Sequence, residues 1–170
     1  MVGLWGASSL VKSVQRGSIA LGAAASATAT VTAVDLANSV VTYGGASCSG
    51  SVSTAAITNT RVALTNATTV TGTRQTADAV TTSVTYEVVE WMPGVVKSVQ
   101  SGTVIHGTPA TITSVNTAKT VVFFGGNSVA NATQANLNVT VTLTNATTVT
   151  AVNDGGNTHA TASFMVVEFF

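Results

Sequence analysis

The side chains that could perform acid–base, nucleophilic or metal chemistry are few and widely spaced in this chain. Its 170 residues include six carboxylates, two histidines (His106 and His159) and one cysteine, Cys48. A metal site needs three or four converging ligands, and only Asp154 lies close to His159 in the sequence. A nucleophilic serine or cysteine would need a neighbouring base, and no Gly-x-Ser-x-Gly motif is present. We therefore expect no catalytic residue, no metal site and no cofactor.

Four charged residues are informative because they recur at matching places. Lys12 and Lys97 follow the first valine of two VKSVQ segments, and Glu90 and Glu168 close two VVE segments. We predict that Lys12 pairs with Glu90, and Lys97 with Glu168, across neighbouring strands, where such pairs help to set the register. The alternative is four solvated surface charges, each pair contributing about 0–1 kcal/mol.

These recurrences belong to a duplication of almost the whole chain. VKSVQ occurs at 11 and 96, LTNATTVT at 64 and 143, and VVE at 88 and 166, so the offset falls from 85 to 79 to 78 residues. A shrinking offset is what deletions in loops of the second copy would produce. The sequence predicts an N-terminal arm at 1–10, a first repeat at 11–91, a linker with the turn signal MPGV at 92–95, and a second repeat at 96–170.

Each repeat has the pattern of short strands. ATATVTAV at 27–34 and VTVTL at 139–143 alternate in polarity with a period of two, as strands with one buried face do. SVVTY and TVVFF are each followed by Gly-Gly, where we expect a bulge or sharp turn. Asn-Ala-Thr-Thr within LTNATTVT is typical of a turn. No helical periodicity competes with this pattern. The sequence predicts an all-β protein of two tandem antiparallel β-sandwich or small barrel modules.

Composition narrows the classes of partner. Residues are 45% hydrophobic and only 7% charged, with a net charge of zero, whereas about 25% of residues in an average globular protein are charged. The six cationic residues are scattered, so nucleic acid is not an expected partner. No apolar run approaches the ~20 residues of a membrane helix, and we expect no membrane insertion. A neutral surface favours association, so a homo-oligomer is expected.

The segments that open and close the first repeat resemble those of a known group of proteins. VKSVQRG at 11–17, the threonine-rich middle and YEVVEW at 86–91 resemble modules of structural proteins of tailed bacteriophages. The second copy departs from this frame at Ser101, which stands where Arg16 stands in the first, and at Phe169 in place of Trp91. The resemblance covers nearly the whole chain. It implies a virion component without catalytic residues, made in the host cytoplasm.

Two virion roles compete for such a protein. A head decoration (cement) protein binds the major capsid protein on the capsid exterior and stabilises the capsomer lattice, and a trimer would suit the threefold positions of the shell. A tail-fibre or adhesin module would instead bind a host glycan or protein. The short chain offers no evident fibre shaft, which favours decoration, while the low aromatic content of 5% offers few platforms for sugars. A tandem of bacterial immunoglobulin-like domains is a third reading, but it would normally bring an export signal.

The apolar arm supplies the expected contact residues. Leu4, Trp5 and Leu10 precede or border the first repeat, and such an arm could lie across a partner subunit. Alternatively Trp5, which precedes the first VKSVQ much as Trp91 precedes the second, fills a pocket of the first repeat.

Overall fold

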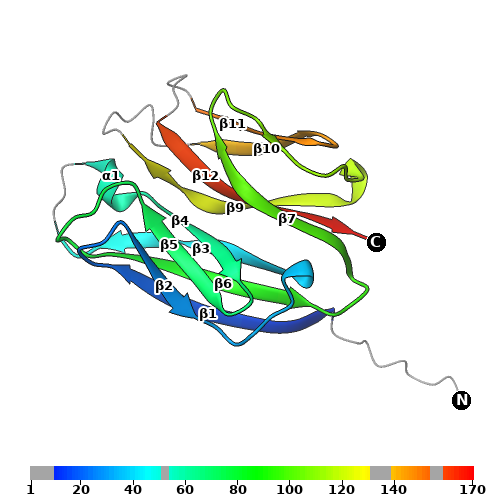
Figure 1. The fold of residues 1–170 in the computed structure, drawn as a ribbon, viewed down its shortest axis with the longest axis horizontal. Coiled ribbons are helices and arrows are strands. Elements are labelled where there is room, and N and C mark those ends of the chain that lie inside the picture. The colour runs from blue at the N-terminus through cyan, green and yellow to red at the C-terminus, as the bar shows by residue number, and fades with distance from the viewer. Residues whose placement is uncertain (1–9, 51–53, 131–138, 154–158) are drawn as a thin grey trace, which may run out of the picture.

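The computed structural model describes residues 10–50, 54–130, 139–153 and 159–170. Figure 1 shows that this part of the chain consists almost entirely of strands, and the strands within its sheets pair antiparallel. The predicted all-β class is confirmed.

The first repeat contains six of the strands and two short helical turns. In chain order these are β1 (Val11–Leu21), β2 (Ser26–Thr30), the 3-10 helix η1 (Leu36–Asn38), β3 (Ser39–Cys48), α1 (Ala55–Thr58), β4 (Thr60–Asn66), β5 (Thr69–Arg74) and β6 (Thr82–Trp91). The strands pair in the orders β1-β6-β3 and β2-β5-β4.

The second repeat has the same order of elements within its described residues. They are β7 (Val96–Ile105), β8 (Ala110–Thr111), the 3-10 helix η2 (Thr117–Lys119), β9 (Thr120–Val129), β10 (Thr140–Asn145), β11 (Thr148–Val152) and β12 (Ala160–Phe169). Here the pairings are β7-β12-β9 and β10-β11-β8, which match the pairings of the first repeat strand for strand.

One backbone pair joins the repeats into a larger sheet. Arg61 on β4 pairs with Gly126 on β9, which produces a six-stranded sheet in the order β2-β5-β4-β9-β12-β7. Gly126 has φ +84°, and a Cβ there would collide with the Thr60 carbonyl and the Tyr43 ring. Only glycine allows this close approach of the two repeats.

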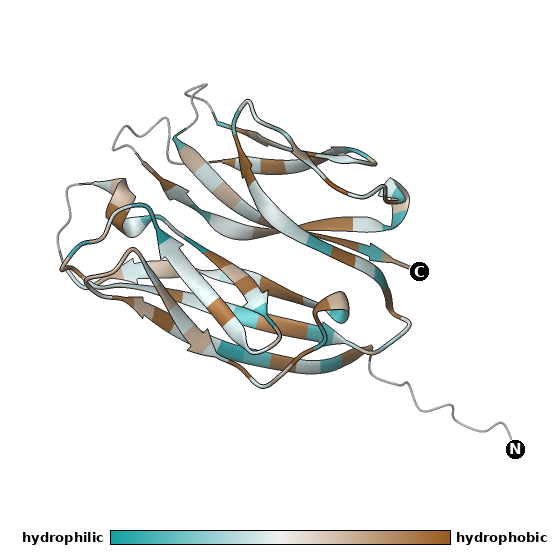
Figure 2. Ribbon diagram, in the orientation of Figure 1, coloured by the Kyte–Doolittle hydropathy of each residue, from teal (hydrophilic) through white to brown (hydrophobic). Residues whose placement is uncertain are grey.

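The apolar core follows from the alternation along the strands, which Figure 2 shows as brown segments between pale and teal ones. In β6, Val84, Tyr86 and Val88 are buried on one face, as the period of two predicts. One core cluster fills the first repeat and continues into the second through Val96, Met165 and Val167, residues that pack in the same cluster as Val40 and Val41 and their neighbours. A second cluster lies wholly within repeat 2. The first core is therefore completed by side chains of the second repeat.

The repeated LTNATTVT octet forms the hairpin turn between β4 and β5, and again between β10 and β11. The Asn66 side chain accepts a hydrogen bond from the Thr68 amide at 2.9 Å, and Asn145 does the same for Thr147 at 2.9 Å. The predicted turn is confirmed, and its side-chain bond is the reason that asparagine stands at this position.

The strand predicted at 27–34 is too long, because contacts with the same turn end it early. The strand ends at Thr30, because the amides of Val31 and Val34 donate to the carbonyls of Thr68 and Ala67, each at 2.9 Å. These bonds draw the chain away from the sheet and across the octet turn. The bulges predicted at the two Gly-Gly pairs are confirmed, since the register shifts between Tyr43 and Gly45 on β3 and between Phe124 and Asn127 on β9.

Candidate interaction surface

Of the three predicted contact residues, Leu10 lies within the described part of the chain, while Leu4 and Trp5 lie outside it. The Leu10 side chain is 65% exposed. Its carbonyl accepts a hydrogen bond from the Met92 amide at 2.9 Å, so the entry to β1 is tied to the linker between the repeats.

Two more exposed apolar residues gather around this point. Met92 is 43% exposed and Phe170 is 67% exposed. The Phe170 amide donates to the carbonyl of Val95, the last linker residue, at 3.4 Å. We call Leu10, Met92 and Phe170 the terminal surface; in Figure 1 the C-terminus and the start of β1 lie at the same end of the molecule.

An aromatic cluster lies next to the terminal surface in the sequence, at Trp91 and Phe169. The Trp91 ring lies edge-on to Phe169 with centroids 5.8 Å apart, and it is tilted against Phe123 at 6.2 Å. These contacts pack the end of β6 against β9 and the end of β12. Large exposed apolar groups grouped in this way are typical of protein-binding sites.

The sequence predicts Leu10 as a contact residue, whereas it makes no such prediction for Met92 or Phe170. The sequence predicts a turn at Met92, and the turn is present, with the Val95 amide donating to the Met92 carbonyl at 3.2 Å. The available signal was that an apolar residue within a Pro-Gly turn has little chance of burial.

Buried carboxylates stand at the same end of each repeat. Glu90 is 2% exposed, and its Oε1 accepts from Lys12 Nζ at 2.8 Å and from the Asp35 amide at 3.0 Å, while Oε2 accepts from the Ser13 hydroxyl at 3.1 Å. Burial acts to raise the pKa of Glu90, but the hydrogen bonds from Lys12, Asp35 and Ser13 bring that pKa below its ordinary value.

The second repeat builds the same network. Glu168 is 2% exposed and accepts from Lys97 Nζ at 2.8 Å, from the Asn116 amide at 2.9 Å and from the Ser98 hydroxyl at 3.5 Å. The hydrogen bond from Lys97, followed by that from the Asn116 amide, lowers the pKa of Glu168. Both predicted Lys–Glu pairs are confirmed. They are not the solvated pairs of the alternative, because each carboxylate is buried and orients the start of a 3-10 helix.

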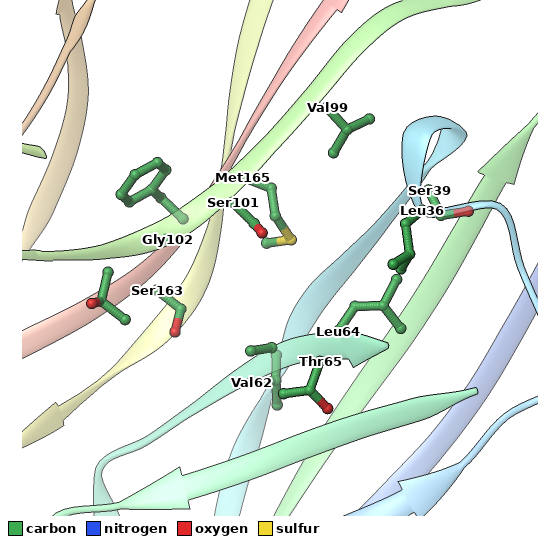
Figure 3. Close-up of a pocket in the computed structure, with 13 residues that line it drawn as sticks. Leu36, Ser39, Val62, Leu64, Thr65, Val99, Ser101, Gly102, Ser163 and Met165 are labelled. Atoms are coloured by element: carbon green, nitrogen blue, oxygen red, sulfur yellow. The ribbon is translucent and has the colours of Figure 1, made fainter. Parts of the chain in front are cut away.

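A cavity of about 470 Å³ lies between the repeats (Figure 3). Leu36, Val62 and Leu64 line it from the first repeat, and Val99, Ser101 and Met165 line it from the second. Its remaining lining residues are small, apolar or hydroxylated, and none of the thirteen is an acid, a base or a thiol. The walls can bury apolar groups and offer hydroxyl hydrogen bonds, and they supply no proton-transfer group.

The isolated titratable residues of the sequence remain apart. His106 accepts a hydrogen bond from the Asn153 amide through Nδ1 at 3.3 Å, and Cys48 lies 3.8 Å from the Thr82 hydroxyl. Within the described ranges, histidines, cysteines and carboxylates form no group of three or more that could hold a metal ion. No helix in the same ranges has the length and apolar character to span a membrane.

Comparison of the chain with protein-family models, with curated proteins and with solved structures found no match.

Proposed function

We propose that this protein is a non-enzymatic structural protein of a bacteriophage virion. In this proposal it decorates the head, binding the major capsid protein on the capsid exterior and stabilising the capsomer lattice. A homo-oligomer, with three copies as the expected number, would carry several binding surfaces to the lattice at once. The sequence frame VKSVQRG…VVEW supports a virion role, and the terminal surface supports a role in binding.

The observation that carries the proposal is the exposure of Leu10, Met92 and Phe170 around the linker that joins the two repeats. The three side chains carry no charge and belong to backbone segments that hydrogen bonds hold together. A surface of this kind matches an apolar patch on a partner protein, since burial of such side chains drives association.

The described aromatic residues weigh against glycan binding by the same protein. Tyr86 and Phe164 are buried, and Trp91 and Phe123 pack against one another, so these rings serve packing. Among the described residues Phe124 and Phe170 are the exposed rings, and Phe124 lies edge-on against Tyr43. A sugar platform would require exposed rings beside polar groups.

The proposal is tested by co-sedimenting the purified protein with expanded, undecorated phage heads and, in parallel, with intact host cells. Saturable binding to heads is expected. Leu10→Asp should weaken it at least about tenfold, since a loss of ~1.4 kcal/mol is one decade in affinity. Val152→Asp is the matched control, because Val152 is 52% exposed and lies on β11, outside the terminal surface.

Binding to cells but not to heads would contradict the decoration role and assign the protein to host recognition. Equal head binding by Leu10→Asp and Val152→Asp would leave that role in place but show that the terminal surface is not the contact.

A further inference from the structure

The cavity between the repeats has an apolar, solvent-exposed residue in its wall. Leu36, in the 3-10 helix η1, lines the cavity and is 44% exposed. Ser39, at the start of β3, also lines it, and Figure 3 shows both residues on one side of the cavity. Ser39 is 3% exposed, and its hydroxyl has no hydrogen-bond partner in the part of the chain that the structure describes. An open leucine beside a buried hydroxyl without a partner suits an occupant that is apolar and carries one donor.

Repeat 2 has neither feature at the matching positions. Thr117 stands where Leu36 stands in repeat 1. Thr120 stands where Ser39 stands, and its hydroxyl donates to the Asn116 carbonyl at 2.7 Å, so it already has a partner. The fold of a repeat therefore does not require an open leucine or an unpaired hydroxyl here. Both are specific to repeat 1, which is the repeat that the N-terminal arm precedes.

The arm joins β1 close to this side of the cavity. Ser13 on β1 and Ser39 on β3 both pair with Glu90 of β6, so two strand spacings, about 10 Å, separate them. Both strands run antiparallel to β6, and Leu10 therefore lies at the end of the sheet where β3 starts, about 14 Å from Ser39. Trp5 precedes Leu10 by five residues, which span up to ~17 Å when extended. The arm is long enough to bring Trp5 to the cavity.

We propose that the chain's own arm occupies the cavity, with Trp5 as its anchor. In this arrangement the indole ring covers Leu36, and its N–H donates to the Ser39 hydroxyl, because a buried tryptophan needs an acceptor for this group. The cavity volume of about 470 Å³ is sufficient for such a ring. The short tether favours the arm of the same chain over that of a second copy, since a short flexible linker gives an effective concentration in the millimolar range.

The arm then acts as a strap between the repeats, because the walls of the cavity come from both of them. Leu10 stays in the terminal surface, while Trp5 turns inward. This inference goes beyond the capsid role, since it concerns a contact within one chain. It also decides between the two roles that the sequence leaves open for Trp5.

Tryptophan fluorescence of the full chain tests the proposal. The chain has two tryptophans, and Trp91→Phe leaves Trp5 as the sole reporter. Phe169 holds the position of Trp91 in repeat 2, so phenylalanine suits this part of the fold. Acrylamide quenching measures the access of solvent to the indole, and circular dichroism checks that each variant folds. Should Trp91→Phe fail to fold, fluorine NMR of the natural sequence labelled with fluorotryptophan follows Trp5 instead, with Trp5→Ala assigning its signal.

Leu36→Asp is the disrupting variant, and Thr117→Asp, at the matching position of repeat 2, is the control. With the cavity intact, Trp5 should emit at short wavelengths and be quenched weakly, as a buried ring is. Leu36→Asp should shift the emission to longer wavelengths and raise the quenching constant toward that of the urea-unfolded chain, because a charge in the cavity wall opposes burial of the indole. Thr117→Asp should change neither quantity.

A mixing experiment distinguishes the arm of the same chain from the arm of a second copy. The Leu36→Asp chain, with Trp5 as its sole tryptophan, is mixed at micromolar concentration with a full chain that carries Trp5→Ala and Trp91→Phe and keeps its cavity. Trp5 should remain strongly quenched. Renewed protection would mean that arms enter the cavities of other copies, and it would overturn the proposal.

Two further results would overturn it: a Trp5 that is quenched with the cavity intact as strongly as in the unfolded chain, or equal quenching in Leu36→Asp and Thr117→Asp. None of these measurements involves phage heads. A protein whose arm fills the cavity but which does not bind heads would contradict the capsid role alone.

Discussion

The middle strands of the two repeats, β6 and β12, have the same partners and register but different surroundings. Along β6 the buried residues alternate with more exposed ones, whereas Ala162 to Glu168 of β12 are all buried. The side chains on the outer face differ accordingly: Glu87 on β6 is replaced by Met165 on β12. The inner faces stay alike, with Val88 and Val166 at matching positions, both fully buried. The inner-face residues are thus alike in both repeats because they build the fold. The residue types on the outer face differ according to what covers that face.

The largest effect is expected from giving β12 the outer residue of β6. Met165→Glu would place a carboxylate against the Val41 amide and the apolar core between the repeats, and should lower the free energy of unfolding by about 4 kcal/mol. Urea denaturation measures the loss. Glu87→Met, the reciprocal change on the open face, should cost less than about 1 kcal/mol. Equal losses for the two variants would contradict the proposed difference in covering.

The buried carboxylates should respond alike in both repeats, because their networks match. Glu90→Gln keeps the shape but removes the charge that accepts from Lys12, and a loss of about 2 kcal/mol is expected for hydrogen bonds to a charged group. Glu168→Gln should lower stability in the same direction. Lys12→Met should cost less than Glu90→Gln, since the lysine is half exposed. A stable Glu90→Gln variant beside an unstable Glu168→Gln variant would show that the networks are not equivalent.

A close contact on the inner face also distinguishes β6 from β12. Tyr86 lies over Gly17, where an added Cβ would be 2.5 Å from the tyrosine hydroxyl oxygen, while Phe164 lies over Gly102 with 3.1 Å to its nearest ring atom. Gly17→Ala should therefore cost about 1–2 kcal/mol by overpacking, and Gly102→Ala should cost less. Thermal unfolding of the two variants makes the comparison. The double variant Gly17→Ala with Tyr86→Phe should recover part of the loss, because the hydroxyl is removed.

Lowering the pH should decrease the free energy of unfolding gradually through both repeats. The pKa values of Glu90 and Glu168 lie below the ordinary value of 4.5 in the folded protein, so the unfolded chain binds protons first as the pH falls. The stabilisation is complete above that ordinary value and is lost as the pH falls through the lowered pKa values. Urea midpoints from neutral pH to about pH 3 should show this decline, and the double variant Glu90→Gln with Glu168→Gln should show less of it. An unchanged slope in the double variant would assign the decline to other carboxylates.

Much of the local structure could be predicted from the sequence, because a duplicated chain states its pattern twice. The alternation of Val84, Tyr86 and Val88 determined one face of β6, and the octet determined a hairpin turn through an asparagine that bonds its own backbone. The pairing of Lys12 with Glu90 followed from matching positions at the two ends of a repeat. These three features depend only on neighbours along one strand or on one pair of strands, and such local relations are visible in the sequence as a period of two.

The tertiary structure alone decided which surfaces the repeats present to each other and which residues remain open. Arg74 illustrates this: it is 1% exposed, and its guanidinium donates to the carbonyls of Gly22, Ala24, Asp78 and Val80. A single arginine in a threonine-rich sequence gives no sign of such burial, because its acceptors are carbonyl groups that every residue carries. The exposure of Met92 and Phe170, like the covering of β12 by repeat 1, is likewise a property of long-range packing. Periodicity specifies which face of a strand is apolar, and only the assembled fold determines what lies against it.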